Sequence, residues 1–212
     1  GHREGQEGRG EGVVTPSRLV VGLGNPGAEY RATRHNLGFL VVENLAERLA
    51  AKGPAREECR ALVVAVQEWL LCEPQTYMNR SGAAVRCLAE RFNLAPDRIL
   101  VIYDEVHLSL GRIRLRGQGS PAGHRGMESI VDALQTEALP RMRLGIGPVP
   151  PGLATRGMEE FVLGRFLPEE QVAVAAMVDR AAAAAAVWLA DGIEVAMHRA
   201  NTPDLPEALE TP

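Results

Sequence analysis

An amide and an imidazole near the start of the chain have the chemistry needed to hold a substrate and to move a proton. The apolar run 19–23 breaks at Gly24-Asn25-Pro26-Gly27, and a polar loop then carries His35. The run predicts a buried strand, and the glycines and proline after it predict a sharp turn. Because open α/β sheets bind ligands beyond the carboxyl ends of their strands, we expect Asn25 and His35 to lie at a ligand site.

The same turn matches the G-x-G-x-x-G pattern of dinucleotide-binding proteins, as Gly22-Leu23-Gly24-Asn25-Pro26-Gly27. However, Pro26 stands where that motif opens its helix, and helical periodicity begins only at Leu37. The next strand also lacks a lone terminal acid placed for a ribose. These departures disfavour a dinucleotide-dependent enzyme. A turn in which the glycines have only a structural role is the other alternative, and it leaves Asn25 and His35 unexplained.

A carboxylate suited to orienting the imidazole follows the apolar run 99–103, which predicts a central strand that ends at Asp104-Glu105. A carboxylate on one imidazole nitrogen fixes the tautomer and makes the other nitrogen a better base. The chain has no nucleophile elbow and no metal-ligand cluster. A water molecule deprotonated by His35 is therefore the favoured nucleophile, and it suits an activated ester better than an amide. The alternatives are a structural histidine and an aspartate that caps a turn or a helix.

Two further loops carry polar side chains of the kinds found in substrate sites. The turn 75–82 holds Met78, as an apolar wall or a core residue, and Asn79. Asn79 either caps the next helix or aims its amide at a carbonyl or a water. The glycine-rich loop 117–126 holds His124 and Arg125, and loops often carry functional residues. The guanidinium of Arg125 is suited to hold a phosphate bidentately, and a solvated surface arginine is the alternative.

Charge is distributed unevenly along the chain. The 212 residues carry a formal net charge of −4, so the overall charge does not indicate nucleic-acid binding. The segments 106–127 and 138–158 nevertheless contain arginines and no acid. This pattern is compatible with a basic face that recognises phosphate on an otherwise acidic protein. A scatter of solvated arginines is the alternative.

The cysteines and the ends of the chain bear on its compartment. Cys59, Cys72 and Cys87 show neither metal-type spacing nor an even-numbered framework, so we expect reduced thiols in a cytoplasmic protein. We find no apolar stretch of the roughly 18 residues that span a bilayer, and therefore expect no membrane partner. Residues 1–17 predict a disordered leader or a cloning remnant without a signal peptide.

The order of predicted elements indicates an α/β fold. Strands alternate with helices, but a hairpin interrupts them, which favours one domain over 18–200 with a mixed β-sheet flanked by helices, followed by a frayed tail at 201–212. The predicted strands are 18–23, 61–66, 69–72, 99–103, 112–116 and 141–146. The predicted helices are 37–49, 81–92, 126–135, 168–190 and 193–200, and 147–157 is a predicted long loop.

Several of these motifs, in this order, resemble the bacterial-type peptidyl-tRNA hydrolase family. The matching stretches are VGLGNPGAEY at 21–30, TRHNLG at 33–38, PQTYMNRSG at 74–82, DE at 104–105, GHRG at 123–126, RMRLGIG at 141–147 and FVLG at 161–164. The resemblance covers about residues 18–200. It implies a single α/β domain with a twisted mixed sheet, and hydrolysis of the ester that joins a peptide to the terminal adenosine of tRNA.

The resemblance also implies roles for individual residues. His35 is the implied general base, Asp104 orients it, and Asn25 binds the peptide backbone and helps to reject free aminoacyl-tRNA. The residues implied to line the cleft for the peptide and the terminal adenosine are Tyr30, Tyr77, Met78 and Asn79. Arg116 and Arg143 fall where the family clamps a tRNA phosphate. The implied partner is tRNA, with no metal and no cofactor, and the implied protein is a cytoplasmic monomer.

The chain departs from the family pattern at three positions. The usual G-H-N-G is Gly123-His124-Arg125-Gly126, and an arginine cannot accept a hydrogen bond as an amide can, although a charged donor can still hold the substrate. His107 replaces a common acid, and Tyr77 replaces a phenylalanine. An RNA-binding splicing factor of the same fold is the alternative function, but the retained motifs and the lack of a visible plastid transit segment favour the hydrolase.

Overall fold

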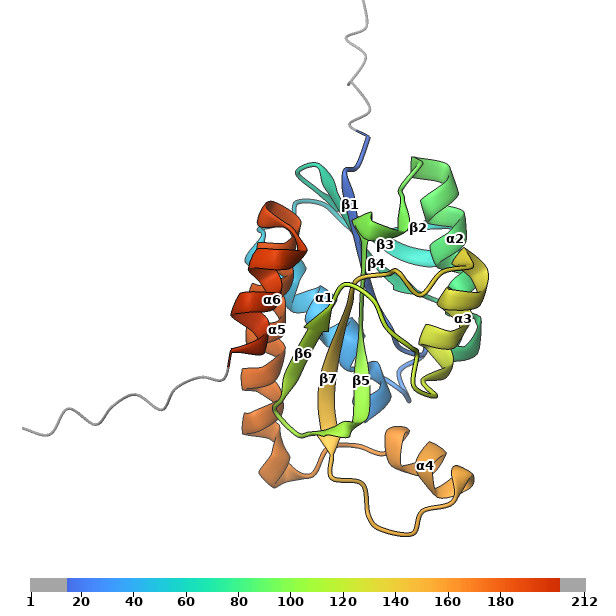
Figure 1. Ribbon diagram of the computed structural model, residues 1–212, viewed down its shortest axis with the longest axis vertical. Coiled ribbons are helices and arrows are strands. Elements are labelled where there is room, and N and C mark those ends of the chain that lie inside the picture. The colour runs from blue at the N-terminus through green and yellow to red at the C-terminus, as the bar shows by residue number, and fades with distance from the viewer. Residues whose placement is uncertain (1–14, 203–212) are drawn as a thin grey trace, which may run out of the picture.

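A seven-stranded mixed sheet forms the centre of the protein in a computed structural model that describes residues 15–202 (Figure 1). The strands lie in the order β2-β3-β4-β1-β5-β7-β6. They are β1 (Arg18–Gly22), β2 (Arg56–Glu58), β3 (Ala61–Val66), β4 (Trp69–Pro74), β5 (Ile99–Ser109), β6 (Ile113–Arg116) and β7 (Arg141–Gly147). The four central strands are parallel, and β3, β2 and β6 extend the sheet by antiparallel pairing. This arrangement confirms the predicted mixed sheet and its hairpin.

Helices cover both faces of the sheet (Figure 1). One face packs against α1 (Leu37–Arg48), α5 (Gln171–Asp191) and α6 (Ile193–Asn201), and the other packs against α2 (Ser81–Phe92) and α3 (Arg125–Leu134). Successive strand residues point to opposite faces, so Val20 joins the first core and Val21 joins the second. Because both faces are buried, the central strands need the continuous apolar runs that predicted them.

Two glycines bring α1 against the sheet and so set the position of the loop before it. A β-carbon on Gly22 would lie 2.2 Å from the carbonyl oxygen of Gly38, and one on Gly38 would lie 2.3 Å from the backbone nitrogen of Leu23. The start of α1 therefore packs directly on the end of β1, and the polar loop that joins them is held at the carboxyl edge of the sheet.

Strand β5 is longer than the sequence predicts. It continues through Asp104 and Glu105 to Ser109 because it goes on pairing with β7. Asp104 is therefore inside the strand, and not at its end as expected. On the other side, β1 stops at Gly22 opposite Ile102, so that edge of β5 is uncovered beyond Ile102.

A short helix, α4 (Thr155–Val162), begins inside the segment predicted as a loop. Its apolar residues Met158, Phe161 and Val162 have helical spacing but cover little more than one turn. Because the stretch before them is rich in proline and glycine, the sequence pattern predicted a loop. Strand β2 was also missed, because three residues give no recognisable alternation. The predicted leader and tail lie outside the described residues, apart from 15–17 and 201–202.

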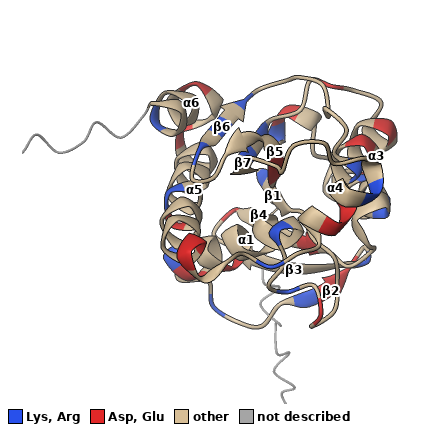
Figure 2. Ribbon diagram, turned by 90° about the horizontal axis from the view of Figure 1, so that it is seen from below, with Lys and Arg blue, Asp and Glu red and all other residues tan. Residues whose placement is uncertain are grey.

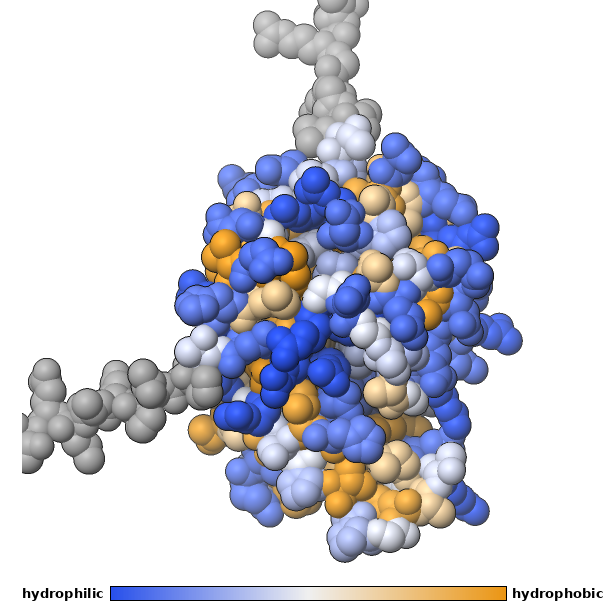
Figure 3. Space-filling model, in the orientation of Figure 1, coloured by the Kyte–Doolittle hydropathy of each residue, from blue (hydrophilic) through white to orange (hydrophobic). Residues whose placement is uncertain are grey.

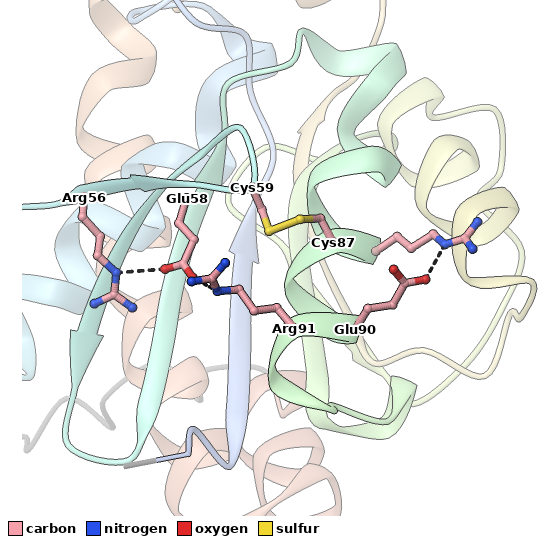
Figure 4. Close-up of a disulfide and its surroundings, with 7 residues drawn as sticks. Arg56, Glu58, Cys59, Cys87, Glu90 and Arg91 are labelled. Atoms are coloured by element: carbon pink, nitrogen blue, oxygen red, sulfur yellow. Dashed lines mark hydrogen bonds and ion pairs between the residues drawn. A yellow bond between two sulfur atoms is a disulfide. The ribbon is translucent and has the colours of Figure 1, made fainter. Parts of the chain in front are cut away.

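Two of the three cysteines form a disulfide, which corrects the prediction of reduced thiols (Figure 4). Cys59, at the turn between β2 and β3, is joined to Cys87 on α2, with the α-carbons 5.6 Å apart. Cys72 is free and buried. The two partners are 28 residues apart in the sequence, so only the packing of the β2–β3 turn against α2 reveals the pair.

The segment Pro168–Asp191, which includes α5, is long and apolar enough to cross a membrane by length and composition, with a mean hydropathy of 1.7. The prediction that no segment reaches this length is therefore wrong. Half of its 18-residue window is buried, and residues such as Met177, Ala181 and Trp188 pack in the core beside α1 and the sheet. Core packing thus accounts for the apolar character of α5.

Candidate active site

His35 and Asp104 meet at the carboxyl edge of the sheet. His35 lies in a single 3-10 turn, Arg34–Asn36, directly before α1. The buried Arg34 anchors this turn through its backbone N–H to the Gly164 carbonyl at 2.9 Å and through its side chain to Glu170 at 3.2 Å. His35 Nδ1 lies 2.9 Å from both carboxylate oxygens of Asp104. A carboxylate only accepts hydrogen bonds, so Nδ1 carries the proton and Nε2 keeps its lone pair.

His124 is a second imidazole on the same carboxylate. Its Nε2 lies 3.1 Å from Asp104 Oδ1, and its Nδ1 accepts a hydrogen bond from the backbone N–H of Met127 at 3.2 Å as the N-cap of α3. Because Nδ1 accepts, the proton of the neutral ring is on Nε2 and is donated to Asp104. The rings of His35 and His124 are 5.0 Å apart, centroid to centroid. The sequence predicted a functional loop at 117–126 but not this contact.

The network sets the charges of its members. Burial alone would raise the pKa of Asp104, but attraction and hydrogen bonding to His35 and His124 hold it far below its usual range. Burial lowers the pKa of His35, yet Asp104 outweighs this effect and raises it above the ordinary value, with Arg125 opposing the rise. Asp104 therefore stays ionised beside two imidazoles. The three side chains are close enough to share a metal ion, but here they bind one another.

Asn25 is fixed by three hydrogen bonds at the end of β1. Its backbone N–H donates to Asn36 Oδ1 at 2.9 Å, and its carbonyl accepts from Asn36 Nδ2 at 3.0 Å. Its side-chain oxygen accepts from the backbone N–H of Met78 at 2.7 Å. These bonds orient the amide so that its NH₂ group stays available as a donor. Turns follow Gly27 in place of a helix, unlike a dinucleotide-binding loop.

A cleft of about 620 Å³ contains these groups, a size typical of a small-molecule or cofactor site. Most of the predicted site residues line it: Asn25, His35, Tyr77, Met78, Asn79, Asp104 and Arg125. The opposite wall comes from α4 and its flanking residues, including Leu153, Met158, Glu159 and Val162. The wall formed by α4 was not predicted, because a long loop was expected at 147–157.

Comparison with known proteins identifies the family. The peptidyl-tRNA hydrolase family matches over residues 19–208. A peptidyl-tRNA hydrolase of Aquifex aeolicus is 41% identical over 89% of this chain and 98% of its own length. One from Mycobacterium tuberculosis is 43% identical over 86% of this chain and 96% of its own length. A solved structure of the Acinetobacter baumannii enzyme is 33% identical, covers 89% of this chain and 96% of that one, and has a TM-score of 0.80.

The chain belongs to the peptidyl-tRNA hydrolase family. It is an enzyme that hydrolyses peptidyl-tRNA, as the motifs indicated. Catalysis is favoured over RNA binding alone, because the proteins that this chain matches over most of their length are hydrolases. The single-domain α/β fold expected from the resemblance is confirmed.

Three residues of the segment 75–80 line the cleft: Tyr77, Met78 and Asn79. Tyr77 has a φ of 60°, which is unusual for a bulky residue, and it is 56% exposed. Tyr30 does not line the cleft but packs edge-on against Tyr77, with centroids 6.5 Å apart. Asn79 does not cap α2, whose N-cap is Arg80 without a side-chain bond. Its amide is therefore available to the cleft.

Arg116 and Arg143 lie outside the cleft, on one face of the β6–β7 ladder. Arg116 pairs with Arg141, and Arg114 pairs with Arg143, so the two predicted residues are diagonal neighbours. Figure 3 shows strongly hydrophilic side chains gathered over this part of the sheet. Arg143 reaches Glu105 at 3.5 Å. Arg141 is buried and donates to the carbonyls of Leu139, Ser120 and Glu137, so it anchors the glycine-rich loop.

Proposed function

We propose that His35 is the general base of this peptidyl-tRNA hydrolase and that Asp104 orients it. The observation that carries this proposal is the contact between His35 Nδ1 and Asp104 at the floor of the cleft, 2.9 Å to each oxygen. The side chain of His35 is 12% exposed, so its free Nε2 is the part of the ring left to meet a water molecule. Without a Ser or Cys nucleophile lining the described cleft, water is the attacking group.

The reaction proceeds in two steps. His35 Nε2 takes a proton from water as the oxygen attacks the ester carbonyl, and Asp104 stabilises the imidazolium that forms. The tetrahedral intermediate then breaks its bond to the ribose oxygen, and His35 returns the proton to that oxygen. The products are the peptide with a free carboxyl group and the tRNA with a free hydroxyl. No cofactor or metal enters these steps.

Substrate binding is assigned to the polar groups around the cleft. The amide of Asn25 is oriented by Asn36 and Met78, which suits it to a peptide carbonyl and to distinguishing peptidyl from free aminoacyl substrates. Tyr77, Met78 and Asn79 line the space for the peptide and the terminal adenosine, and Tyr30 supports Tyr77 from outside. Arg125 donates to the substrate from the opposite side.

The tRNA body is assigned to the basic face of β6 and β7. Arg116 and Arg143 lie on the same face, and their guanidinium groups bind phosphate bidentately. The cleft is complete within one chain, which supports action as a monomer, and the packing of α5 in the core supports a protein that is not inserted in a membrane. A cytoplasmic location is proposed from the substrate of the family, peptidyl-tRNA, which is released from ribosomes.

The test is cleavage of peptidyl-tRNA by the wild type and His35→Ala, with unblocked aminoacyl-tRNA as the control substrate. We expect the wild type to cleave only peptidyl-tRNA, and His35→Ala to lose this activity while it still binds tRNA. Full activity in His35→Ala would refute the assignment of the base. Arg143→Ala should weaken tRNA binding and flatten its salt dependence, and an unchanged salt slope would refute the phosphate contact.

A further inference from the structure

Arg125 and Glu159 face one another across the cleft. Arg125 is the first residue of α3, and Glu159 lies in the middle of α4. Their side chains form an ion pair, and both residues line the cleft that holds His35. Seen from below in Figure 2, α4 lies near α3 on the same side of the molecule, and Figure 1 shows α4 below the end of α3. The pair therefore closes part of the space that the substrate must enter.

This ion pair is the only one between α3 and α4 among residues 15–202. The far end of α4 has a separate attachment, because the Arg34 guanidinium lies 4.4 Å from the Phe161 ring. The pair itself is exposed, 58% for Arg125 and 46% for Glu159, and exposed ion pairs contribute little stability. A competing anion can therefore replace Glu159 without unfolding α4.

The substrate carries such an anion near the reacting bond. The nucleotide that carries the 3′ ester also carries a 5′ phosphate, one ribose away from the reacting bond. An arginine prefers phosphate oxygens in a bidentate arrangement. The charge of Arg125 also lowers the pKa of His35, so the guanidinium acts on the reacting centre. By contrast, the carboxylate of Glu159 repels any phosphate that enters while it is unpaired.

We propose that Arg125 binds the 5′ phosphate of the substrate's terminal nucleotide, and that Glu159 occupies Arg125 until that phosphate replaces it. This inference rests on the proposed function, because it takes the cleft around His35 as the place of ester hydrolysis. In this inference Arg125 recognises the negative charge of the phosphate, whereas the family pattern has a neutral asparagine at this position. Glu159 becomes a competitor of the substrate, so the two partners of one ion pair affect KM in opposite directions.

The test compares two short substrates that differ by one phosphate: an N-acetylaminoacyl ester of adenosine, and the same ester of adenosine 5′-phosphate. In the wild type we expect the phosphate to lower KM several-fold. In Arg125→Gln that advantage disappears, so the two substrates have equal KM. In Glu159→Gln the KM for the phosphorylated substrate falls below the wild-type value. Arg156→Gln, which removes a charge from α4 outside the cleft, is the matched control. It should leave the KM of both substrates at the wild-type value.

Other results would overturn the inference. If the phosphate lowers KM equally in the wild type and in Arg125→Gln, Arg125 does not bind it. If Glu159→Gln raises KM as Arg125→Gln does, and the exchange Arg125→Glu with Glu159→Arg restores it, the pair only fastens α4. His35→Ala in the same assay separates this inference from the proposed function. Loss of turnover there, together with an unchanged phosphate effect in Arg125→Gln, refutes the role of Arg125 alone.

Discussion

Asp104 accepts hydrogen bonds from His35 at 2.9 Å and from His124 at 3.1 Å, so one buried carboxylate orients two imidazoles. Only one of these rings has its remaining nitrogen free for chemistry, because His124 Nδ1 accepts the backbone N–H of Met127. In the proposed mechanism, His35 is the reacting ring and His124 is the ring that holds the carboxylate in place. The predictions below separate these roles.

Asp104→Asn should lower kcat by at least about 10²-fold and leave KM within a few-fold of the wild type. The amide keeps the shape of the carboxylate but offers His35 a donor where it needs an acceptor, so the wrong tautomer is favoured. Steady-state kinetics on peptidyl-tRNA measure both constants, and thermal melting checks the fold. A variant that folds and turns over at the wild-type rate would contradict the orienting role.

His124→Asn should lower kcat by about 10-fold while α3 stays capped. Asparagine is a good N-cap residue, so it can still accept the Met127 N–H, but it is too short to replace the bond to Asp104. His124 acts through Asp104, and its loss should therefore also move the inflection of the pH–rate profile. His124→Ala removes both bonds and should lower the melting temperature as well. Equal kcat for His124→Asn and the wild type would show that His124 is only a cap.

The rate should rise with pH through an inflection above 6.5, the ordinary pKa of histidine, because Asp104 raises the pKa of His35. The base must be neutral to accept a proton, so activity is lost as the pH falls below that inflection. Above the inflection the rate reaches its maximum. Arg125 lowers the same pKa, so Arg125→Gln should shift the inflection upwards. Arg156→Gln serves as the control. The pH profile of kcat/KM reports the pKa of His35 in the free enzyme. A downward shift of this pKa in Arg125→Gln would contradict the effect assigned to the charge of Arg125.

Glu73→Gln should stabilise the protein at alkaline pH. Burial, together with the charge of Glu43, raises the pKa of Glu73 to about 7, with Arg31 opposing. Its folded pKa is higher than its unfolded pKa, so the stabilisation is present at low pH and is lost as the pH rises through about 7. We expect the variant to gain ~2 kcal/mol at pH 8 and much less at pH 5, measured by urea unfolding. Glu57→Gln, on exposed strand β2, is the control, and an equal gain there would refute the prediction.

Reduction of the disulfide between Cys59 and Cys87 should lower the free energy of unfolding by about 3–4 kcal/mol, from the chain entropy of the loop that it closes. Strand β2 and helix α2 are also tied by the ion pair of Glu58 with Arg91 (Figure 4), so we expect the fold and the activity to persist. The measurement is urea unfolding with and without a dithiol. The double variant Cys59→Ser with Cys87→Ser should not respond to the dithiol, and an unresponsive wild type would show that the thiols are not paired.

The sequence by itself determined most of the secondary structure and pointed to the residues that we propose as the reacting groups. The apolar runs at 18–23, 61–72 and 141–146 became strands because both of their faces, or one of them, are buried. Helix 81–92 was predicted with its observed bounds. His35 was recognisable because it lies in the polar loop before the helical pattern that begins at Leu37. Asp104 was recognisable because it directly follows the apolar run 99–103. Such signals are carried by neighbouring residues, and they survive in the folded chain.

Only the tertiary structure decided which side chains meet. The bond from His124 to Asp104, the disulfide from Cys59 to Cys87 and the ion pair from Arg125 to Glu159 each join segments that are 20 to 34 residues apart. No local periodicity encodes these contacts, since they depend on how β5, α2, α3 and α4 pack. The length of β5 depends on its pairing with β7, and the apolar repeat of α4 is too short to mark it beside a proline-rich loop. The cleft is therefore a product of packing around motifs that the sequence already displayed.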